Sequence, residues 1–202
     1  MLYILQAIAT LIAVFAVSIM SQFPPPEDPS VATQFIQDLD ALISKTATQQ
    51  ASADAITFLD GPALFTDRGH LYDTLEAFES LVASMDIYTS QIRDAPPLPT
   101  GTNSDTVTTR YRIYMSNQGR VMATLNRHAG LFRAIRLGGR VVSGLESFRR
   151  SVINFESAVL VFNPTRAEET HAFTLDMIDR LNGAVLAYGG AVGRVRRRAL
   201  AG

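Results

Sequence analysis

Apolar residues recur along most of the chain at alternating intervals of three and four positions. This spacing averages 3.5 residues and places the apolar side chains on one stripe of a helix, as in left-handed supercoiled packing. Four stretches show it most clearly, over residues 32–42, 71–92, 141–162 and 178–195. The pattern therefore predicts long helices that pack along their apolar stripes.

A further helix is predicted over about 105–136, and its stripe has two polar interruptions. The stripe runs Tyr111, Tyr114, Gln118, Val121, Leu125, His128, Phe132, Ile135. A polar group buried at Gln118 or His128 must find a hydrogen bond or cost roughly 1–3 kcal/mol. We interpret both as buried polar residues that fix the register of helix packing. The alternative is that one of them contacts a ligand or a metal ion.

Proline and glycine divide the chain into segments. Residues 22–29 form a proline-rich spacer, and three prolines between 95 and 104 mark a loop. We predict an all-α fold, an antiparallel up-and-down bundle of four main helices with heptad-like seams, preceded by an N-terminal hydrophobic helix. The bundle domain is expected over residues 30–198, with a short tail over 199–202.

The first 21 residues contain no charged side chain. A helix of about 20 such residues spans roughly 30 Å, the thickness of the hydrocarbon core of a membrane. We expect a membrane anchor that leaves the bulk of a single-pass protein on the non-cytoplasmic side. A cleaved signal segment, which would make the protein secreted, is the alternative. Burial of this segment in the core of the domain is a third interpretation.

Charge is distributed unevenly between the two halves of the chain. Residues 1–101 carry 3 basic and 12 acidic side chains, whereas residues 102–202 carry 15 basic and 7 acidic ones. We expect acidic helices of the first half to pack beside basic helices of the second. The acidic half argues against nucleic acid as a partner. The last basic cluster lacks nearby acids and is a candidate contact for an anionic partner or lipid: Arg194, Arg196, Arg197, Arg198.

Motifs for catalysis are missing from the sequence. The chain has no cysteine, which excludes disulfides and thiolate chemistry, and it has no P-loop, HExxH or dinucleotide-binding motif. We therefore expect a protein that is not an enzyme and binds no cofactor or metal.

One pattern resembles the spacing used in di-metal helical bundles. Glu168 and His171 stand at positions i and i+3, and Asp67 and His70 repeat this spacing less closely. However, Thr165 and Glu168 also fit a capping box at the start of a helix.

Three functions are compatible with these observations. We favour a non-catalytic, membrane-anchored or exported bundle that binds other protein subunits, within a larger assembly. The second is a carrier of an apolar ligand or lipid in the bundle interior, and the third is a di-metal bundle protein. A cavity lined by the apolar stripes would favour the carrier.

Overall fold

The computed structural model describes residues 29–133 and 138–190, and all regular structure in these ranges is helical. The long helices are α2 (Pro29–Asp54), α4 (His70–Arg93), α5 (Thr102–Arg133), α6 (Gly138–Phe162) and α7 (Ala167–Ala187). The connections hold the short helix α3 (Asp60–Ala63) and the 3-10 turns η1 (Leu64–Thr66) and η2 (Pro164–Arg166). The predicted all-α bundle is confirmed.

The described residues form five long helices, whereas the predicted bundle had four main ones. The helix beyond that count is α5, which corresponds to the further helix predicted over about 105–136. With 32 residues, α5 is the longest of the five. The apolar stripe of α5 is interrupted by Gln118 and includes two tyrosines. Its apolar periodicity is therefore less clear than that of the other long helices.

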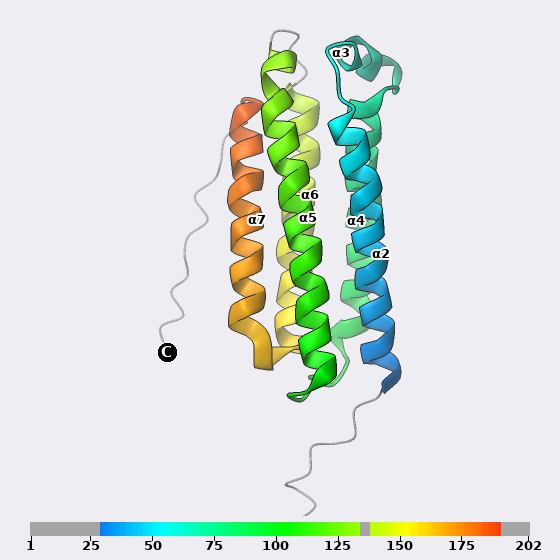
Figure 1. The fold of residues 1–202 in the computed structure, drawn as a ribbon, viewed down its shortest axis with the longest axis vertical. Coiled ribbons are helices and arrows are strands. Elements are labelled where there is room, and N and C mark those ends of the chain that lie inside the picture. The colour runs from blue at the N-terminus through cyan, green and yellow to red at the C-terminus, as the bar shows by residue number, and fades with distance from the viewer. Residues whose placement is uncertain (1–28, 134–137, 191–202) are drawn as a thin grey trace, which may run out of the picture.

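The five long helices form two layers (Figure 1). Helices α7, α5 and α2 lie side by side in one layer, and α6 and α4 form the other. Each helix packs on two neighbours, which closes a ring in the order α2, α5, α7, α6, α4. We call the end where α2 begins the proximal end, and the end that holds α3 the distal end.

The chain direction alternates from each long helix to the next, as an up-and-down fold requires. Successive helices are not always neighbours, however, because α5 packs mainly on α2 and α7. Three of the five neighbouring pairs, α2–α5, α5–α7 and α4–α6, are therefore parallel rather than antiparallel. Periodicity fixes which face of a helix is buried, but it does not fix which helix covers that face.

The core consists of the apolar stripes that the spacing predicts. Every residue of the α6 stripe from Val141 to Phe162 is buried. Aromatic rings join the two layers: Phe35 of α2 lies 5.4 Å from Phe162 and 6.0 Å from Phe155, measured between ring centres. Within the α4–α6 layer, the rings of Phe78 and Phe148 lie 4.8 Å apart. Full burial of such a side chain contributes roughly 1.5–3 kcal/mol, so these rings account for much of the packing.

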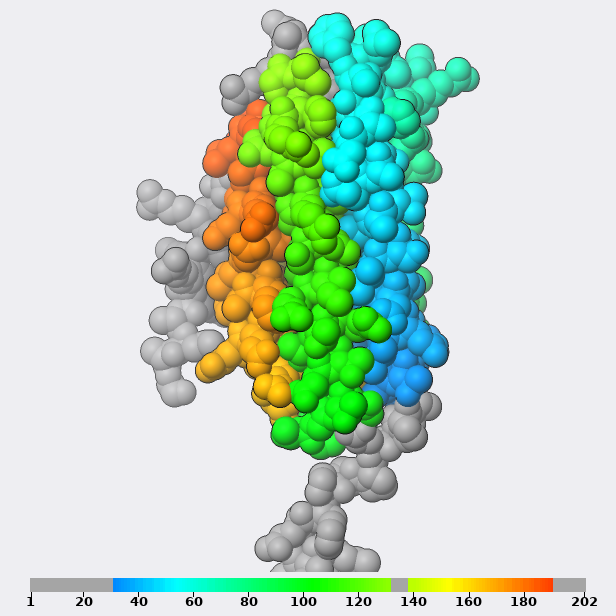
Figure 2. Space-filling view, viewed as in Figure 1, coloured from blue at the N-terminus to red at the C-terminus, as the bar shows by residue number. Residues whose placement is uncertain are grey.

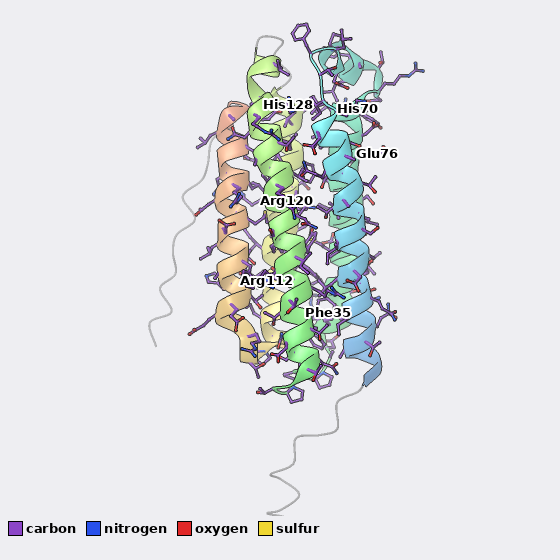
Figure 3. All side chains as sticks on the ribbon, viewed as in Figure 1. Phe35, His70, Glu76, Arg112, Arg120 and His128 are labelled. Atoms are coloured by element: carbon purple, nitrogen blue, oxygen red, sulfur yellow. The ribbon has the colours of Figure 1, made fainter. Side chains whose placement is uncertain are left out.

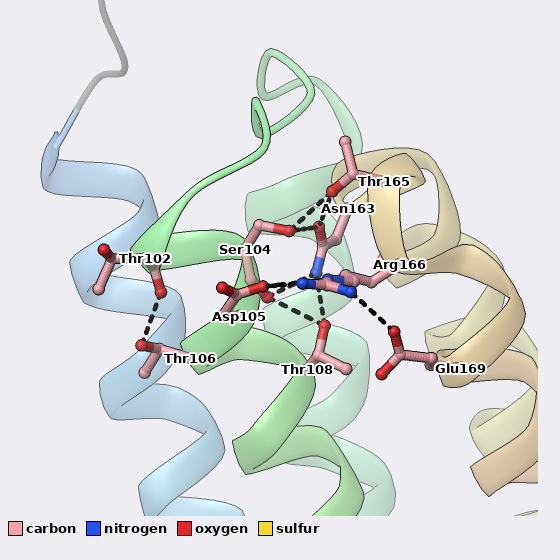
Figure 4. Close-up of polar contacts among 9 residues, drawn as sticks. All are labelled: Thr102, Ser104, Asp105, Thr106, Thr108, Asn163, Thr165, Arg166 and Glu169. Carbon is pink, nitrogen blue, oxygen red and sulfur yellow. Dashed lines mark hydrogen bonds and ion pairs between the residues drawn. The ribbon is translucent and has the colours of Figure 1, made fainter.

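A polar cluster ties the start of α5 to the connection between α6 and α7 at the proximal end (Figure 4). The Asn163 side-chain amide donates to the Ser104 carbonyl and to Thr108 Oγ1, both at 3.0 Å. Thr165 Oγ1 lies 2.7 Å from Ser104 Oγ. The hydroxyl of Thr165 is thus used here and gives α7 no side-chain cap, so the predicted capping box does not form.

No helix within residues 29–133 and 138–190 is long and apolar enough to cross a membrane. The predicted anchor over 1–21 lies outside the described residues, as do residues 22–28 of the spacer, residues 191–198 of the predicted bundle domain and the tail over 199–202. The proposed limits of the bundle domain, at 30 and 198, stay predictions.

Candidate functional site: a groove between α4 and α6

A groove of about 530 Å³ runs between α4 and α6. It lies in the α4–α6 layer, behind the α2, α5 and α7 face seen in the space-filling view of Figure 2. Its walls are formed by Tyr72, Leu75, Glu76, Phe78, Glu79, Val82, Ala83, Asp86, Arg140, Ser143, Gly144, Ser147. The volume falls within the roughly 300–1,000 Å³ that ligand sites occupy in proteins.

Small residues on α6 create this groove. Ser143, Gly144 and Ser147 lie along one side of the helix, where longer side chains would fill the space against α4. A Cβ added at Gly144 would stand 3.6 Å from a methyl group of Leu75, which is ordinary van der Waals contact. The groove therefore depends on the small size of these residues, and a larger side chain can close it without a clash at the backbone.

The floor and the edge of the groove differ in polarity. Leu75 and Phe78 are buried members of the α4 stripe and form the floor, together with the half-buried Val82. Glu76, Glu79 and Asp86 are exposed on the α4 edge, so the edge is acidic along its length. Residues 72–86 of α4 extend about 21 Å at 1.5 Å per residue. The site is long, with an apolar floor under a charged edge.

Arg140 provides a positive charge at the distal end of the groove. The Arg140 guanidinium lies 5.6 Å from the centre of the Tyr72 ring. It donates to the Leu64 carbonyl at 3.1 Å and to Asp67 Oδ1 at 2.8 Å. Side chains of Arg140 and Asp67 are about half exposed or more, which leaves the guanidinium open to exchange its partner for another anion.

A second hollow, of about 380 Å³, lies between the start of α2 and the end of α4. Asp38 lines it and is only 6% exposed. Its Oδ1 accepts from the Gln34 amide at 3.0 Å, whereas its Oδ2 is buried without a hydrogen-bond partner. Burial raises the pKa of Asp38 and outweighs the opposing effect of Gln34. Ionisation of Asp38 is therefore less favourable than that of a solvent-exposed aspartate.

Gln118 lies fully buried inside the bundle, in a hydrogen-bonded network between α5 and α2. Its amide nitrogen donates to Thr46 Oγ1 at 2.8 Å and to Gln49 Oε1 at 3.2 Å. Gln49 in turn donates to the Thr74 carbonyl of α4 at 3.2 Å. The residues thus connect three helices, although the Gln118 carbonyl oxygen itself has no partner.

The three histidines are spread over both ends of the bundle. His70 and His128 lie at the distal end (Figure 3), and His128 is partly exposed rather than buried in the seam. His171 lies near the start of α7 at the proximal end, with Nδ1 2.8 Å from Glu156 Oε1. The described residues contain no group of three or more histidine or acidic side chains that could hold a metal ion. The spacing of Glu168 and His171 therefore does not build a di-metal site with His70.

Ion pairs connect the acidic first half to the basic second half. Arg110 pairs with Asp40 at 3.0 Å, Arg127 approaches Asp54 to 3.8 Å, and Arg140 pairs with Asp67. Each pair joins different segments at the surface, where such contacts contribute little individually. The candidate cluster Arg194, Arg196, Arg197 and Arg198 lies outside the described residues.

Sequence reasoning missed the groove. Its signal was present in α6, where Ser143, Gly144 and Ser147 form a small-residue strip beside the stripe of Val141, Leu145 and Phe148. The strip becomes a groove only because α4 is the neighbour at that face, and periodicity did not identify that neighbour.

Comparison with known proteins gives one informative match. No protein-family model matches the chain, and no curated protein matches its sequence. Among solved structures, the chain is similar to the crystal structure of AFMP4P in complex with palmitic acid, with a TM-score of 0.67. The match covers 78% of this chain and 99% of that chain at 14% sequence identity. At that identity the similarity establishes a shared fold.

Proposed function

We propose that this protein is a non-catalytic carrier of a fatty acid or similar apolar ligand, held in the groove between α4 and α6. The observation that carries the proposal is the apolar floor of Leu75, Phe78 and Val82 in a groove of about 530 Å³. The shared fold with a protein crystallised with palmitic acid supports it. The bundle interior, where the sequence analysis placed a carrier's ligand, is occupied by buried aliphatic and aromatic side chains, so we assign the ligand to the groove.

The charges of the groove orient the ligand in this proposal. A carboxylate is repelled by Glu76, Glu79 and Asp86 along the edge. Arg140 at the distal end is the cation of the groove, and a ligand carboxylate there can replace the exposed Asp67 as its partner. The acyl chain then extends over the floor toward Asp86. Arginine suits this role because its planar guanidinium binds a carboxylate through two hydrogen bonds.

Filling the groove tests the proposal. Gly144→Leu places a side chain over the floor next to Leu75, and it should weaken binding of palmitic acid by the full chain at least tenfold. Gly183→Leu on α7 is the matched control, because a Cβ there meets nothing within 4 Å. Displacement of a fluorescent fatty acid measures binding, and urea unfolding verifies that both variants are folded. Equal affinity in Gly144→Leu and Gly183→Leu would rule out the groove as the site.

The acidic edge of the same groove favours a second candidate, a protein partner. Glu76, Glu79 and Asp86 recur along one side of α4 and match a basic helix laid into the groove. This is the interaction function that the sequence favours, as a subunit of a larger assembly. Glu76→Gln, Glu79→Gln and Asp86→Asn together should abolish binding of such a partner, whereas they should preserve or strengthen binding of a fatty acid.

A further inference from the structure

A buried aspartate lines the hollow between the start of α2 and the end of α4, at the proximal end of the bundle. Asp38 is 6% exposed, whereas aspartate is almost never fully buried in proteins unless its charge is paired. Its Oδ1 accepts one hydrogen bond, from the exposed Gln34, and its Oδ2 has no hydrogen-bond partner among the described residues. Gln34 can give up this bond to another donor, and rotation of the carboxyl group brings either oxygen to the hollow. Asp38 therefore has unused capacity to accept hydrogen bonds there.

Asp38 has no basic partner within residues 29–133 and 138–190. Lys45 is the only basic residue of α2, and it lies seven residues further on, about 11 Å at 1.5 Å per residue, where it donates to two serines of α4. Arg93 at the end of α4 lines a different hollow, between α4 and α6. Arg110 of α5 pairs with Asp40 instead, at 3.0 Å. The negative charge that Asp38 brings to the hollow when it ionises is thus not compensated by these side chains.

The rest of the hollow is apolar except for two exposed glutamines. Phe35 and Ile92 are buried, and Val31 is partly buried. Gln34 and Gln91 complete the walls. The volume of about 380 Å³ is near the lower end of the roughly 300–1,000 Å³ that ligand sites occupy. Apolar walls with one charged group in a defined place suit a small ligand that has an apolar body and one group of opposite charge.

The buried acid has a cost for the folded protein. Burial raises the pKa of Asp38, and the hydrogen bond from Gln34 opposes this only in part. Asp38 therefore contributes less to stability at neutral pH than in acid. Ionisable groups whose pKa is shifted by burial are concentrated at functional sites. A bound cation would supply the partner that the protein itself does not provide.

We propose that the hollow between α2 and α4 binds a small organic cation, a primary amine on a short apolar chain, with its ammonium group at the Asp38 carboxylate and its chain against Val31, Phe35 and Ile92. An ammonium group donates three hydrogen bonds and carries the charge opposite to that of the carboxylate. A divalent metal ion fits less well, because it requires several oxygen ligands, and the described residues hold no group of three acidic or histidine side chains. The hollow lies on the α2 side of α4, and the groove on its α6 side, so this proposal stands without the carrier function.

The proposal is tested with n-hexylamine as the probe, in isothermal titration calorimetry of the full chain at neutral pH. An aliphatic amine is protonated there, since the ammonium of lysine has a pKa of about 10.4. The alcohol n-hexanol is the matched probe, because it has the same chain without the charge. Hexylamine should bind at least tenfold more tightly than hexanol.

Three variants locate the site. Asp38→Asn preserves the shape of the side chain and removes its charge, so it should weaken hexylamine binding at least tenfold and change hexanol binding little. Asp40→Asn is the matched control, because Asp40 is an exposed acid of the same helix that does not line the hollow. Val31→Phe places a larger side chain in the hollow and should weaken binding of both probes. Thermal unfolding verifies that each variant is folded.

Four results would overturn the proposal. Hexylamine that does not bind the wild type, or binds no more tightly than hexanol, would show that the hollow does not select a cation. Equal hexylamine affinity in the wild type and Asp38→Asn would show that Asp38 is not its partner. A loss of affinity in Glu79→Gln but not in Asp38→Asn would place the amine at the acidic edge of the groove between α4 and α6.

Discussion

The guanidinium of Arg140 lies 5.6 Å from the centre of the Tyr72 ring, and so joins the first turn of α6 to the first turn of α4. A cation over an aromatic ring is attracted by the negative face of the ring. This contact does not use the N–H groups of the guanidinium, which donate hydrogen bonds to the Leu64 carbonyl and to Asp67 Oδ1. Arg140 therefore holds a defined position at the distal end of the groove.

This position leads to a prediction about the ligand headgroup. Arg140→Gln should weaken binding of palmitic acid at least tenfold, because the ligand carboxylate loses its charged partner. A hydrogen bond to a charged group contributes roughly 1.5–3 kcal/mol. Binding of the alcohol of the same chain length should change little. Arg127→Gln is the matched control, since Arg127 is also an exposed arginine paired across helices. An equal loss for acid and alcohol would show that Arg140 does not contact the headgroup.

Chain length provides a separate prediction for the groove floor. A methylene transferred out of water contributes about 0.8 kcal/mol, so affinity should rise by up to roughly fourfold for each added carbon. The rise should stop when the acyl chain exceeds the groove, about 21 Å along α4. Titration of saturated fatty acids of increasing length measures this. Affinity that is independent of chain length would contradict binding on an apolar floor.

Gln118 provides a prediction about stability. Gln118→Leu removes the amide that donates a hydrogen bond to Gln49 Oε1. Gln49 is buried, so its oxygen then loses its hydrogen-bond donor on α5. We expect a loss of about 1–3 kcal/mol in the free energy of unfolding, measured by urea titration. The double variant Gln118→Leu with Gln49→Leu removes both polar groups and should regain part of that loss. No recovery in the double variant would show that the network is not the source of the effect.

Asp60 should stabilise the protein at neutral pH. Burial acts to raise its pKa, but the hydrogen bonds from Thr57 and His70 together lower it below the ordinary value of 3.8. A lowered pKa means that the stabilisation is present above 3.8 and is lost as pH falls through the folded-state pKa. Asp60→Asn should therefore cost about 2–4 kcal/mol at pH 7, because three donors, from Thr57 and His70, lose a charged acceptor. The difference from the wild type should shrink in acid, as thermal unfolding at several pH values would show.

Asp38 should have the opposite pH dependence. Burial raises its pKa above 3.8, so its favourable contribution is present below 3.8 and is lost as pH rises through the folded-state pKa. The side chain in the Asp38→Asn variant cannot ionise, so the variant does not lose stability in this way as pH rises. Between acid and neutral pH, the variant should gain stability relative to the wild type in the same unfolding measurements. A constant difference across that range would show that Asp38 does not titrate abnormally.

The sequence predicts the buried faces of the helices better than it predicts their neighbours. Spacing alone identified Phe35, Phe78 and Phe148 as core residues, because a 3.5-residue repeat determines which face is apolar. The same spacing placed His128 on the seam, although its side chain is partly exposed. A straight helix drifts by about 20° per heptad from that repeat. A residue two heptads beyond Tyr114 can therefore turn out of the core.

The groove and the polar network depend on pairings between distant segments. Gln118 was recognisable as a polar residue in an apolar stripe, but its partners Thr46 and Gln49 follow only from the packing of α5 on α2. Gly144 likewise borders a groove because Leu75 lies opposite to it. No local pattern in one helix specifies these contacts, since they depend on the order of helices in the ring.

That order has a consequence for how the chain folds. The pairs α2–α4 and α6–α7 are helical hairpins, each formed by helices that follow one another and pack together. Helix α5 contacts α2 on one side and α7 on the other, so it can complete its packing only when both hairpins are present. Local contacts form faster than distant ones because less chain entropy is lost. The two hairpins should therefore form early, and docking of α5 between α2 and α7 should be the late step that makes the bundle cooperative.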